Sequence, residues 1–596
     1  MKIISNTIRI LSASAIGCIL LWSCSDVFET ESSSVLFEED NKMDTPNDSL
    51  YSVMGILSQF QRIGERSLLL GELRGDLMDV TSDASLDLQE IAGFKVSEDN
   101  SYLKKNDYYQ IINNCNYAIA NMDTSLVIYQ NKVMLPEYAA IKAIRAWTYW
   151  QLGLAFGEVR WMVDPVVDVE SNLSGCPVYS LEQLSEALIK DLVPYVDIRS
   201  LEYGTIDGYA SARMFVPVDL MLGDLYLFRN DYVNAASMYY HYINRRDMVI
   251  SSAYACNWDR NTRETATTDH RNSYAEEMEA GFVYSSDPRE YHPQLVRLAY
   301  NVKPSIVPSD VFVDDMTRSM YFYSEQGSTQ VTGFFEGDLR GQAVASVGTV
   351  YPVAFGQISP KGYENMYITK YYNDVQLAGG ENQVSTSFSN GYDPENPLLS
   401  TLVYVRCLPF YTRAEIYLRY AEALNRLGKP SLAFAVMKYG LNKTNMEDAT
   451  KVSPGELKGE TYIDFTDPVF DTNVGTAERG RGRGVANDRE FFVIPDYNVY
   501  EEQIDEGTGE IVKVPSTRPE DMAKALSDSI LYVEDCLVDE MAAESCFEGH
   551  RFFDLMRIAR HRNEYPAYMA EKVARRFADY EAMKTRLSDA GQWFLK

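Results

Sequence analysis

A helix-turn-helix unit that recurs along the chain is the feature that most constrains the fold. In its clearest copy, Tyr417, Ala421 and Leu424 share one face of a helix, and Gly428 begins the turn into a second helix. Units of this kind bury their apolar faces only by stacking on one another. The sequence therefore predicts a mainly α scaffold of paired helices. The three copies span residues 213–243, 413–441 and 530–560.

The interlocking of small and large apolar residues in these units is of tetratricopeptide type. A further helical hairpin is expected at residues 106–122 and 136–156, where apolar residues recur at intervals of three and four. On the helix that begins at Arg413, the glutamate-first pairs Glu415/Arg419 and Glu422/Arg426 have the favourable four-residue spacing. We expect these pairs to lie on its outer face.

The helical pattern divides the chain into parts. A chain of 596 residues exceeds the roughly 250–300 residues at which one core stops growing, so two or more packed subdomains are expected. Gly, Pro, Ser and Asn increase in the middle, where short strand-like runs such as residues 281–284 and 367–372 replace the helical period. The predicted parts are a helical part at 48–243, an irregular loop and short-strand subdomain at 244–411, and a second helical part at 412–596.

The first residues have the pattern of a lipoprotein signal peptide. Lys2 and Arg9 precede an apolar stretch from Ile10 to Trp22, which is too short to cross a bilayer. The stretch ends in Leu-Trp-Ser-Cys24, which resembles the bacterial lipobox. We therefore expect residues 1–23 to be removed and Cys24 to carry lipid, which anchors the protein to a membrane. The alternative is an ordinary Cys24 and a soluble secreted form. Residues 24–47 are polar and acidic and predict a flexible tether.

Composition and motifs exclude some functions and leave others open. The net charge of −31 repels polyanions, so nucleic-acid binding is disfavoured. The arginine-glycine run at residues 479–484 is expected to be a turn or a local carboxylate or phosphate contact. No HExxH or GxSxG motif occurs and the five histidines lack metal-ligand spacing, so no metal or cofactor is predicted. A glycoside hydrolase remains open, because 86 acidic residues offer many carboxylate pairs.

Three local sequence motifs resemble those of a known protein family. Residues 540–557, with Phe-Glu-Gly-His-Arg at 547–551, are the strongest of them, and residues 413–428 and the pair 109–116 with 142–157 are the others. Together they resemble the SusD/RagB family of outer-membrane nutrient-binding lipoproteins. The motif at residues 540–557 contains Glu544, Arg551 and Asp554, which we expect to form a buried structural network rather than a catalytic one. Met541 and Ser545 stand where the family commonly has arginine and leucine.

The resemblance implies a binding protein and not an enzyme. Such a protein captures an oligomeric nutrient, usually a glycan, and acts as the lid of a SusC-type TonB-dependent importer. The acidic stretch after Cys24 is similar to signals that direct Bacteroidetes lipoproteins to the cell surface. A member of the same family that binds a peptide or another nutrient is the alternative.

Candidate ligand contacts come from two segments. Sugar recognition needs an aromatic face beside hydrogen-bonding groups, and one polar loop has both. Its residues are Tyr254, Asn257, Trp258, Asp259 and Arg260. Ordinary surface is the other interpretation of this loop. The resemblance adds the loop after the first helices, with Arg74, Asp76 and Asp79, whose acids could equally be helix caps. Trp147 and Trp150 are expected to be packed.

Overall fold

The computed structural model describes most of the helical parts and pieces of the middle of the chain. The Cys24 leader and tether and the loop at residues 254–261 lie outside the described residues. The described residues are 46–167, 175–250, 277–285, 287, 289–299, 303–318, 321–326, 331–336, 338, 340, 345–347, 366–368, 370–372, 405, 407–480, 493–504, 507 and 509–596.

The N-terminal part is helical, as predicted. The first described helix begins at Pro46, two residues before the Asp48 at which the helical pattern starts, so the last two residues of the predicted tether are helical. Helix α7 ends where Gly157 takes a positive φ of 79°, and α8 begins with a reciprocal capping box between Ser180 and Gln183. The helices are α3 (Pro46–Phe60), α4 (Gly64–Glu72), α5 (Leu86–Ala92), α6 (Lys105–Asn121), α7 (Leu135–Phe156), α8 (Leu181–Leu192), α9 (Val218–Phe228) and α10 (Tyr232–Arg245).

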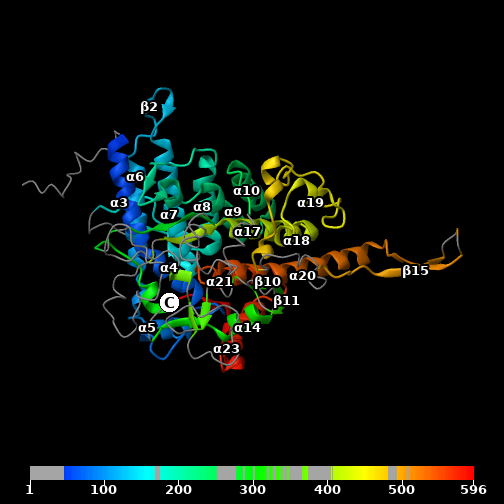
Figure 1. Cartoon of the computed structure of the whole chain (residues 1–596). Helices are drawn as coiled ribbons and strands as arrows, with labels where there is room; N and C mark the ends of the chain where they lie inside the picture. The colour runs from blue at the N-terminus through cyan, green and yellow to red at the C-terminus, as the bar shows by residue number, and fades with distance from the viewer. Residues whose placement is uncertain are drawn as a thin grey trace, which may run out of the picture.

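The predicted helix-turn-helix units are confirmed as antiparallel helix pairs. Helices α6 and α7 form the expected hairpin, and α9 with α10 forms the first unit. The second pairs α17 (Arg413–Arg426) with α18 (Pro430–Lys438), and the third joins α20 (Pro519–Ser545) to α21 (Arg551–Ala559). Helix α10 packs against α17, so units far apart in sequence stack side by side (Figure 1). The scaffold is therefore continuous across the middle segment.

Short antiparallel strands occur throughout, and every sheet in the described part has two strands. The predicted strand at residues 281–284 overlaps β8 (Met278–Val283) except for Tyr284, and β8 pairs with β14 (Cys407–Thr412). The predicted strand at 367–372 is only partly correct, since Lys370–Tyr372 is a 3₁₀ helix. The other strand pairs are β1 (Met78–Val80) with β9 (Ile306–Pro308), β2 (Val127–Ile128) with β3 (Asn131–Lys132), β4 (Glu158–Arg160) with β5 (Val178–Ser180), β6 (Thr205–Ile206) with β7 (Tyr209–Ala210), β10 (Tyr321–Gln326) with β11 (Val331–Glu336), β12 (Ala345–Val347) with β13 (Met366–Ile368), and β15 (Tyr500–Ile504) with β16 (Ile511–Pro515). The remaining helices are α13 (Leu295–Ala299), α14 (Asp310–Arg318), α19 (Lys443–Glu447), α22 (Ala567–Ala574) and α23 (Tyr580–Leu587).

One continuous hydrophobic core joins the described elements. Its centre is an aromatic cluster in which Phe60 of α3 and Trp147 of α7 pack against Phe282 of β8 and Phe410 of β14, with ring centroids 4.8–6.0 Å apart. The cluster of buried side chains extends from Val53 to Leu595. The middle strands β8 and β14 thus contribute to the core of the N-terminal helices. Trp147 and Trp150 are buried, as expected.

An arm projects from this body. It consists of the β15–β16 hairpin and the N-terminal half of α20, and it extends to one side of the molecule (Figure 1). Ile504 and Ile511 face each other across the hairpin and are 70% and 69% exposed. Met522 and Leu526 are exposed on the helix of the same arm.

Candidate binding site

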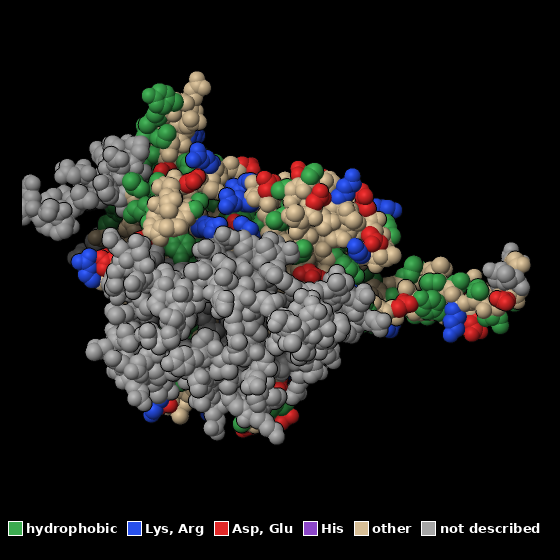
Figure 2. All heavy atoms as spheres, viewed as in Figure 1, with side chains coloured by type: hydrophobic (Ala, Val, Ile, Leu, Met, Phe, Trp, Pro, Cys, Tyr) green, Lys and Arg blue, Asp and Glu red, His purple; other side chains and the backbone are tan. Residues whose placement is uncertain are grey.

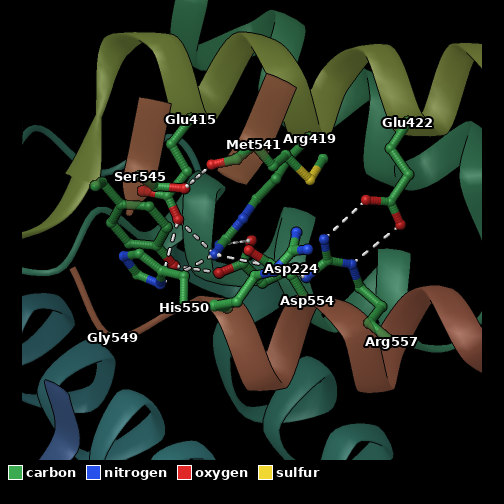
Figure 3. A network of polar contacts seen from close by, with 12 residues as sticks. Asp224, Glu415, Arg419, Glu422, Met541, Ser545, Gly549, His550, Asp554 and Arg557 are labelled. Carbon is green, nitrogen blue, oxygen red and sulfur yellow. Dashed lines mark hydrogen bonds and ion pairs between the residues drawn. The ribbon is translucent and has the colours of Figure 1, made fainter. Parts of the chain in front are cut away.

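A buried network of charges joins α9, α17 and α21, and α21 belongs to the motif at residues 540–557 (Figure 3). Arg419 forms ion pairs with Asp224 at 2.6 Å and Glu415 at 2.5 Å, and its guanidinium lies 3.9 Å from Asp554. Asp224 also accepts hydrogen bonds from the hydroxyls of Tyr239 and Tyr411, both at 2.6 Å. Each carboxylate is thus held by groups of the chain itself.

A second arginine continues this network along the helices. Arg557 forms a bidentate pair with Glu422 at 3.0 and 2.8 Å and a further ion pair with Asp554 at 2.6 Å. Burial alone would raise the pKa of Glu422, but Arg557 brings it down to about 2. Burial raises the pKa of Glu415 to about 8 against the opposing effect of Arg419. Burial therefore favours the protonated form of Glu415, whereas Arg557 keeps Glu422 ionised.

These contacts correct the prediction of outer charge pairs on the helix from Arg413. Glu415 does pair with Arg419, but both are buried. Glu422 pairs with Arg557 instead of Arg426, which reaches Glu534 of α20. Helix α17 is enclosed on all sides by neighbouring helices, so it has no outer face on which such pairs could be solvated.

The expected single network of Glu544, Arg551 and Asp554 is also corrected. All three are buried, as predicted, but each belongs to a different set of contacts. Glu544 pairs with Arg340 and Arg479, and Arg551 forms a bidentate pair with an aspartate of another loop. Arg479, the first arginine of the arginine-glycine run, thus makes the carboxylate contact that was expected there.

The loop after the first helices is placed in the interior. Asp76 is fully buried and is the aspartate that binds Arg551, at 2.6 and 2.9 Å. Arg74 is also buried, and it donates to the carbonyl oxygens of Leu70 and Trp593. Asp79 is partly exposed and pairs with Arg576 at 2.9 Å. Burial gives Arg74 and Asp76 structural contacts, which argues against their predicted role at a surface ligand.

A surface cleft lies between the end of α10, the start of α7, the segment before α9 and Glu279 of β8. Residues 251–276, which contain Trp258, connect the end of α10 to β8. Tyr242 at the end of α10 donates to Glu279 of β8 at 3.0 Å, and Arg246 lies 3.6 Å from the same carboxylate. These three residues line the cleft together with the start of α7 and the segment before α9. The described residues that flank the loop, Ile250 and Glu277, contact Asn473 and Arg479 instead, so they lie at the segment 473–479 and not in the lining of the cleft.

Arginines outnumber acids in this cleft. Arg199, Arg213, Arg245 and Arg246 line it, against Asp219 and Glu279, whereas the whole chain has 55 basic and 86 acidic residues. Figure 2 shows Lys and Arg side chains gathered over α8, α9 and α10 on this face. The space within the cleft is about 50 Å³, so it admits one polar or anionic group of a ligand and not a whole molecule.

The acids of the cleft are already neutralised. Asp219 pairs with Arg245 at 2.7 Å and with His241 at 3.3 Å, and the hydrogen bond that Asp219 accepts from His241 raises the pKa of the imidazole. Arg413 binds Glu279 at 2.8 Å. Among the described residues, Arg199 has no partner, and it is exposed at the edge. Sequence reasoning missed these arginines, because they are scattered over nearly fifty residues with no common spacing.

Other kinds of site receive no support from the described residues. Within them, no group of three or more His, Cys, Asp or Glu side chains could hold a metal ion. None of their helices is both long and apolar enough to cross a membrane.

Comparison with known proteins identifies the fold. No protein-family model and no curated protein matches the sequence. A SusD superfamily protein of Bacteroides vulgatus has 13% identity and a TM-score of 0.53, over 91% of this chain and 92% of that chain. A SusD-like carbohydrate-binding protein of Bacteroides fragilis has 11% identity and a TM-score of 0.52, over 87% and 86%. NanU of B. fragilis has 16% identity and a TM-score of 0.51, over 92% and 94%.

The chain therefore has the fold of the SusD superfamily, over nearly the full length of these proteins. At this level of identity the likeness identifies the architecture. It agrees with the family that the three sequence motifs resemble.

Proposed function

We propose that this protein is a carbohydrate-binding lipoprotein of the outer membrane, held at the cell surface by lipid on Cys24. It would capture a glycan without cleaving it and act as the lid of a SusC-type TonB-dependent importer. The observation that carries the proposal is the SusD fold over nearly the whole chain, because one structure with this fold is described as a SusD-like carbohydrate-binding protein. The lipobox-like sequence before Cys24 supports the anchor.

The ligand is proposed to bind where the Trp258 loop meets the arginine-lined cleft. Trp258 would supply an aromatic face for a sugar ring, and Tyr254, Asn257, Asp259 and Arg260 would supply hydrogen bonds. The cleft arginines would donate to hydroxyl or carboxylate oxygens of the same ligand. The support for this position is that α10 and β8, the elements before and after the loop in the sequence, meet at the cleft through the contacts of Tyr242, Arg246 and Glu279.

Affinity electrophoresis with a panel of polysaccharides tests the proposed site. Trp258→Ala is expected to abolish the retardation that the wild-type protein shows on its preferred glycan. Tyr129→Ala is the matched control, because Tyr129 is an aromatic residue 94% exposed on another loop. Equal retardation of the wild type and Trp258→Ala would reject the Trp258 loop as a ligand contact.

Three further measurements test the remaining parts of the proposal. Gentle solubilisation of membranes with a tagged protein is expected to recover a large outer-membrane barrel, and its absence would count against the lid role. Release of reducing ends during incubation with the bound polysaccharide would replace the binding role with that of a glycoside hydrolase.

The lipid anchor is tested by metabolic labelling. Cys24→Ala is expected to prevent incorporation of labelled fatty acid.

A further inference from the structure

Among the described buried arginines, Arg74 differs in having no carboxylate partner. Arg340, Arg479 and Arg551 each pair with at least one carboxylate. Arg74 donates from Nε to the carbonyl of Leu70 and from Nη1 to that of Trp593, both at 2.8 Å. Its Nη2 has no acceptor. In the described part of the chain, no acid balances its charge.

The surroundings of Arg74 make this charge costly. The guanidinium lies 4.3 Å from the ring centroid of Phe552, and the side chain is only 1% exposed. Burial lowers the pKa of Arg74 to about 9. A cation held in this way is stabilised when an anion comes within hydrogen-bonding distance.

A cavity beside Arg74 has room for such an anion. Its volume is about 170 Å³, well above the roughly 15 Å³ that a water molecule needs. It lies between the segment after α5 and the last residues of the chain. The lining residues are Arg74, Ile91, Phe94, Lys95, Val96, Arg586, Gln592, Trp593, Phe594, Leu595 and Lys596.

The polar groups of this cavity are almost all cationic. Four of the described lining residues are Lys or Arg, and none is Asp or Glu. Arg586 donates from Nη2 to the carbonyl of Phe94 at 2.5 Å, and its Nε is buried without an acceptor. Two guanidinium groups at one cavity therefore each have a donor without a partner. In a chain with a net charge of −31, such a grouping of positive charge is unusual.

We propose that this cavity is a binding site for a small oxyanion, held between Arg74, Arg586 and Lys95. An oxyanion suits the site better than a halide, because the planar guanidinium donates parallel hydrogen bonds to two oxygens. The bound anion would supply the counter-charge that Arg74 lacks. It would also connect the segment at residues 592–596 to residues 94–96 after α5, both of which line the cavity.

Isothermal titration calorimetry tests the site. The purified protein is titrated with inorganic phosphate, sulfate or acetate in chloride buffers of equal ionic strength. Saturable binding with one site per chain is expected for at least one of them. Binding of phosphate or sulfate alone would identify a free tetrahedral anion as the ligand, and binding of acetate would identify the carboxylate of an organic molecule.

Two substitutions connect binding to the cavity. Lys95 is exposed and makes no side-chain contact with the described residues, so Lys95→Gln is expected to fold normally and to weaken binding about threefold to tenfold. Lys95→Gln combined with Arg586→Gln should abolish it. Lys458→Gln is the matched control, because Lys458 is exposed and lies outside the cavity lining. The absence of saturable binding for all three anions, or an equal loss in Lys458→Gln and Lys95→Gln, would overturn the proposal.

Discussion

At the scale of single residues, Gly549 of the Phe-Glu-Gly-His-Arg motif occupies a position that only glycine fits. Its φ is +96°, and a Cβ atom there would lie 2.6 Å from Cα of Leu68. A Cβ on Gly71 would lie only 1.7 Å from the carbonyl oxygen of Gly549. The turn between α20 and α21 therefore touches the backbone of α4, and this contact accounts for the glycine of the motif.

Gly549→Ala is expected to destabilise the protein by about 3 kcal/mol or more, because it combines backbone strain with a backbone clash. Urea denaturation measures the change. Gly459→Ala is the control, since Gly459 has a φ of +86° but no atom within 4 Å of its Cβ position. Its cost should be limited to about 1 kcal/mol. Equal costs for the two variants would show that the contact with α4 does not matter.

Replacing each of two glutamates of α17 with glutamine should lower the free energy of unfolding by different amounts. Glu415 keeps its proton up to about pH 8 in the folded protein, so Glu415→Gln is expected to cost less than about 1 kcal/mol at pH 7. Glu422, whose pKa is about 2, is ionised, and Glu422→Gln should cost about 3–5 kcal/mol because Arg557 loses one of its two carboxylate partners. Denaturation of both variants at pH 7 gives the comparison. A larger loss in Glu415→Gln would contradict the protonation states.

The same carboxyl group predicts a pH dependence. Unfolded Glu415 loses its proton near pH 4.5, whereas the folded group holds it to about pH 8. The folded state thus binds more protons in this window, and the contribution of Glu415 to stability falls as pH rises, by up to about 1.4 kcal/mol per unit. Unfolding free energies between pH 5 and 8 should decline less in Glu415→Gln than in the wild type. Parallel curves would contradict this assignment.

At the scale of elements, α20 is one helix with two environments. Its first half belongs to the exposed arm, where Leu526 is 43% exposed, and its second half is buried among the other helices, where Leu537 is 0% exposed. Leu537→Ala should therefore cost about 2–5 kcal/mol through lost burial and a cavity, and Leu526→Ala less than about 0.5 kcal/mol. Thermal unfolding of the two variants checks this. Similar melting temperatures would mean that the arm is packed in solution.

The sequence predicted the positions of the helices better than the burial of their charged residues. The helix pairs were predictable, because the three- and four-residue spacing of apolar side chains is local information. The burial of Glu415 and Glu422 was not, because a spacing of four residues looks the same on an exposed helix and on an enclosed one. Only the packing of α9, α20 and α21 around α17 decides where the partners of these acids lie.

At the scale of the whole molecule, the shared core makes the described parts interdependent. Phe60 and Trp147 of the N-terminal helices contact Phe282 and Phe410 of the middle strands. We expect calorimetry to show one cooperative transition with equal calorimetric and van't Hoff enthalpies. Phe410→Ala should lower the temperature of the whole transition. Separate transitions for the two helical parts would contradict a common core.

The sequence by itself determined the paired-helix class, the positions of the repeated units and the resemblance to SusD/RagB proteins. These properties depend on short-range periodicity and on motifs of adjacent residues. Tertiary structure decided which charges are buried, that Arg74 and Asp76 lie in the interior, and that Arg199, Arg213, Arg245 and Arg246 meet at one cleft. These outcomes depend on contacts between residues far apart in the chain, and no local spacing encodes them.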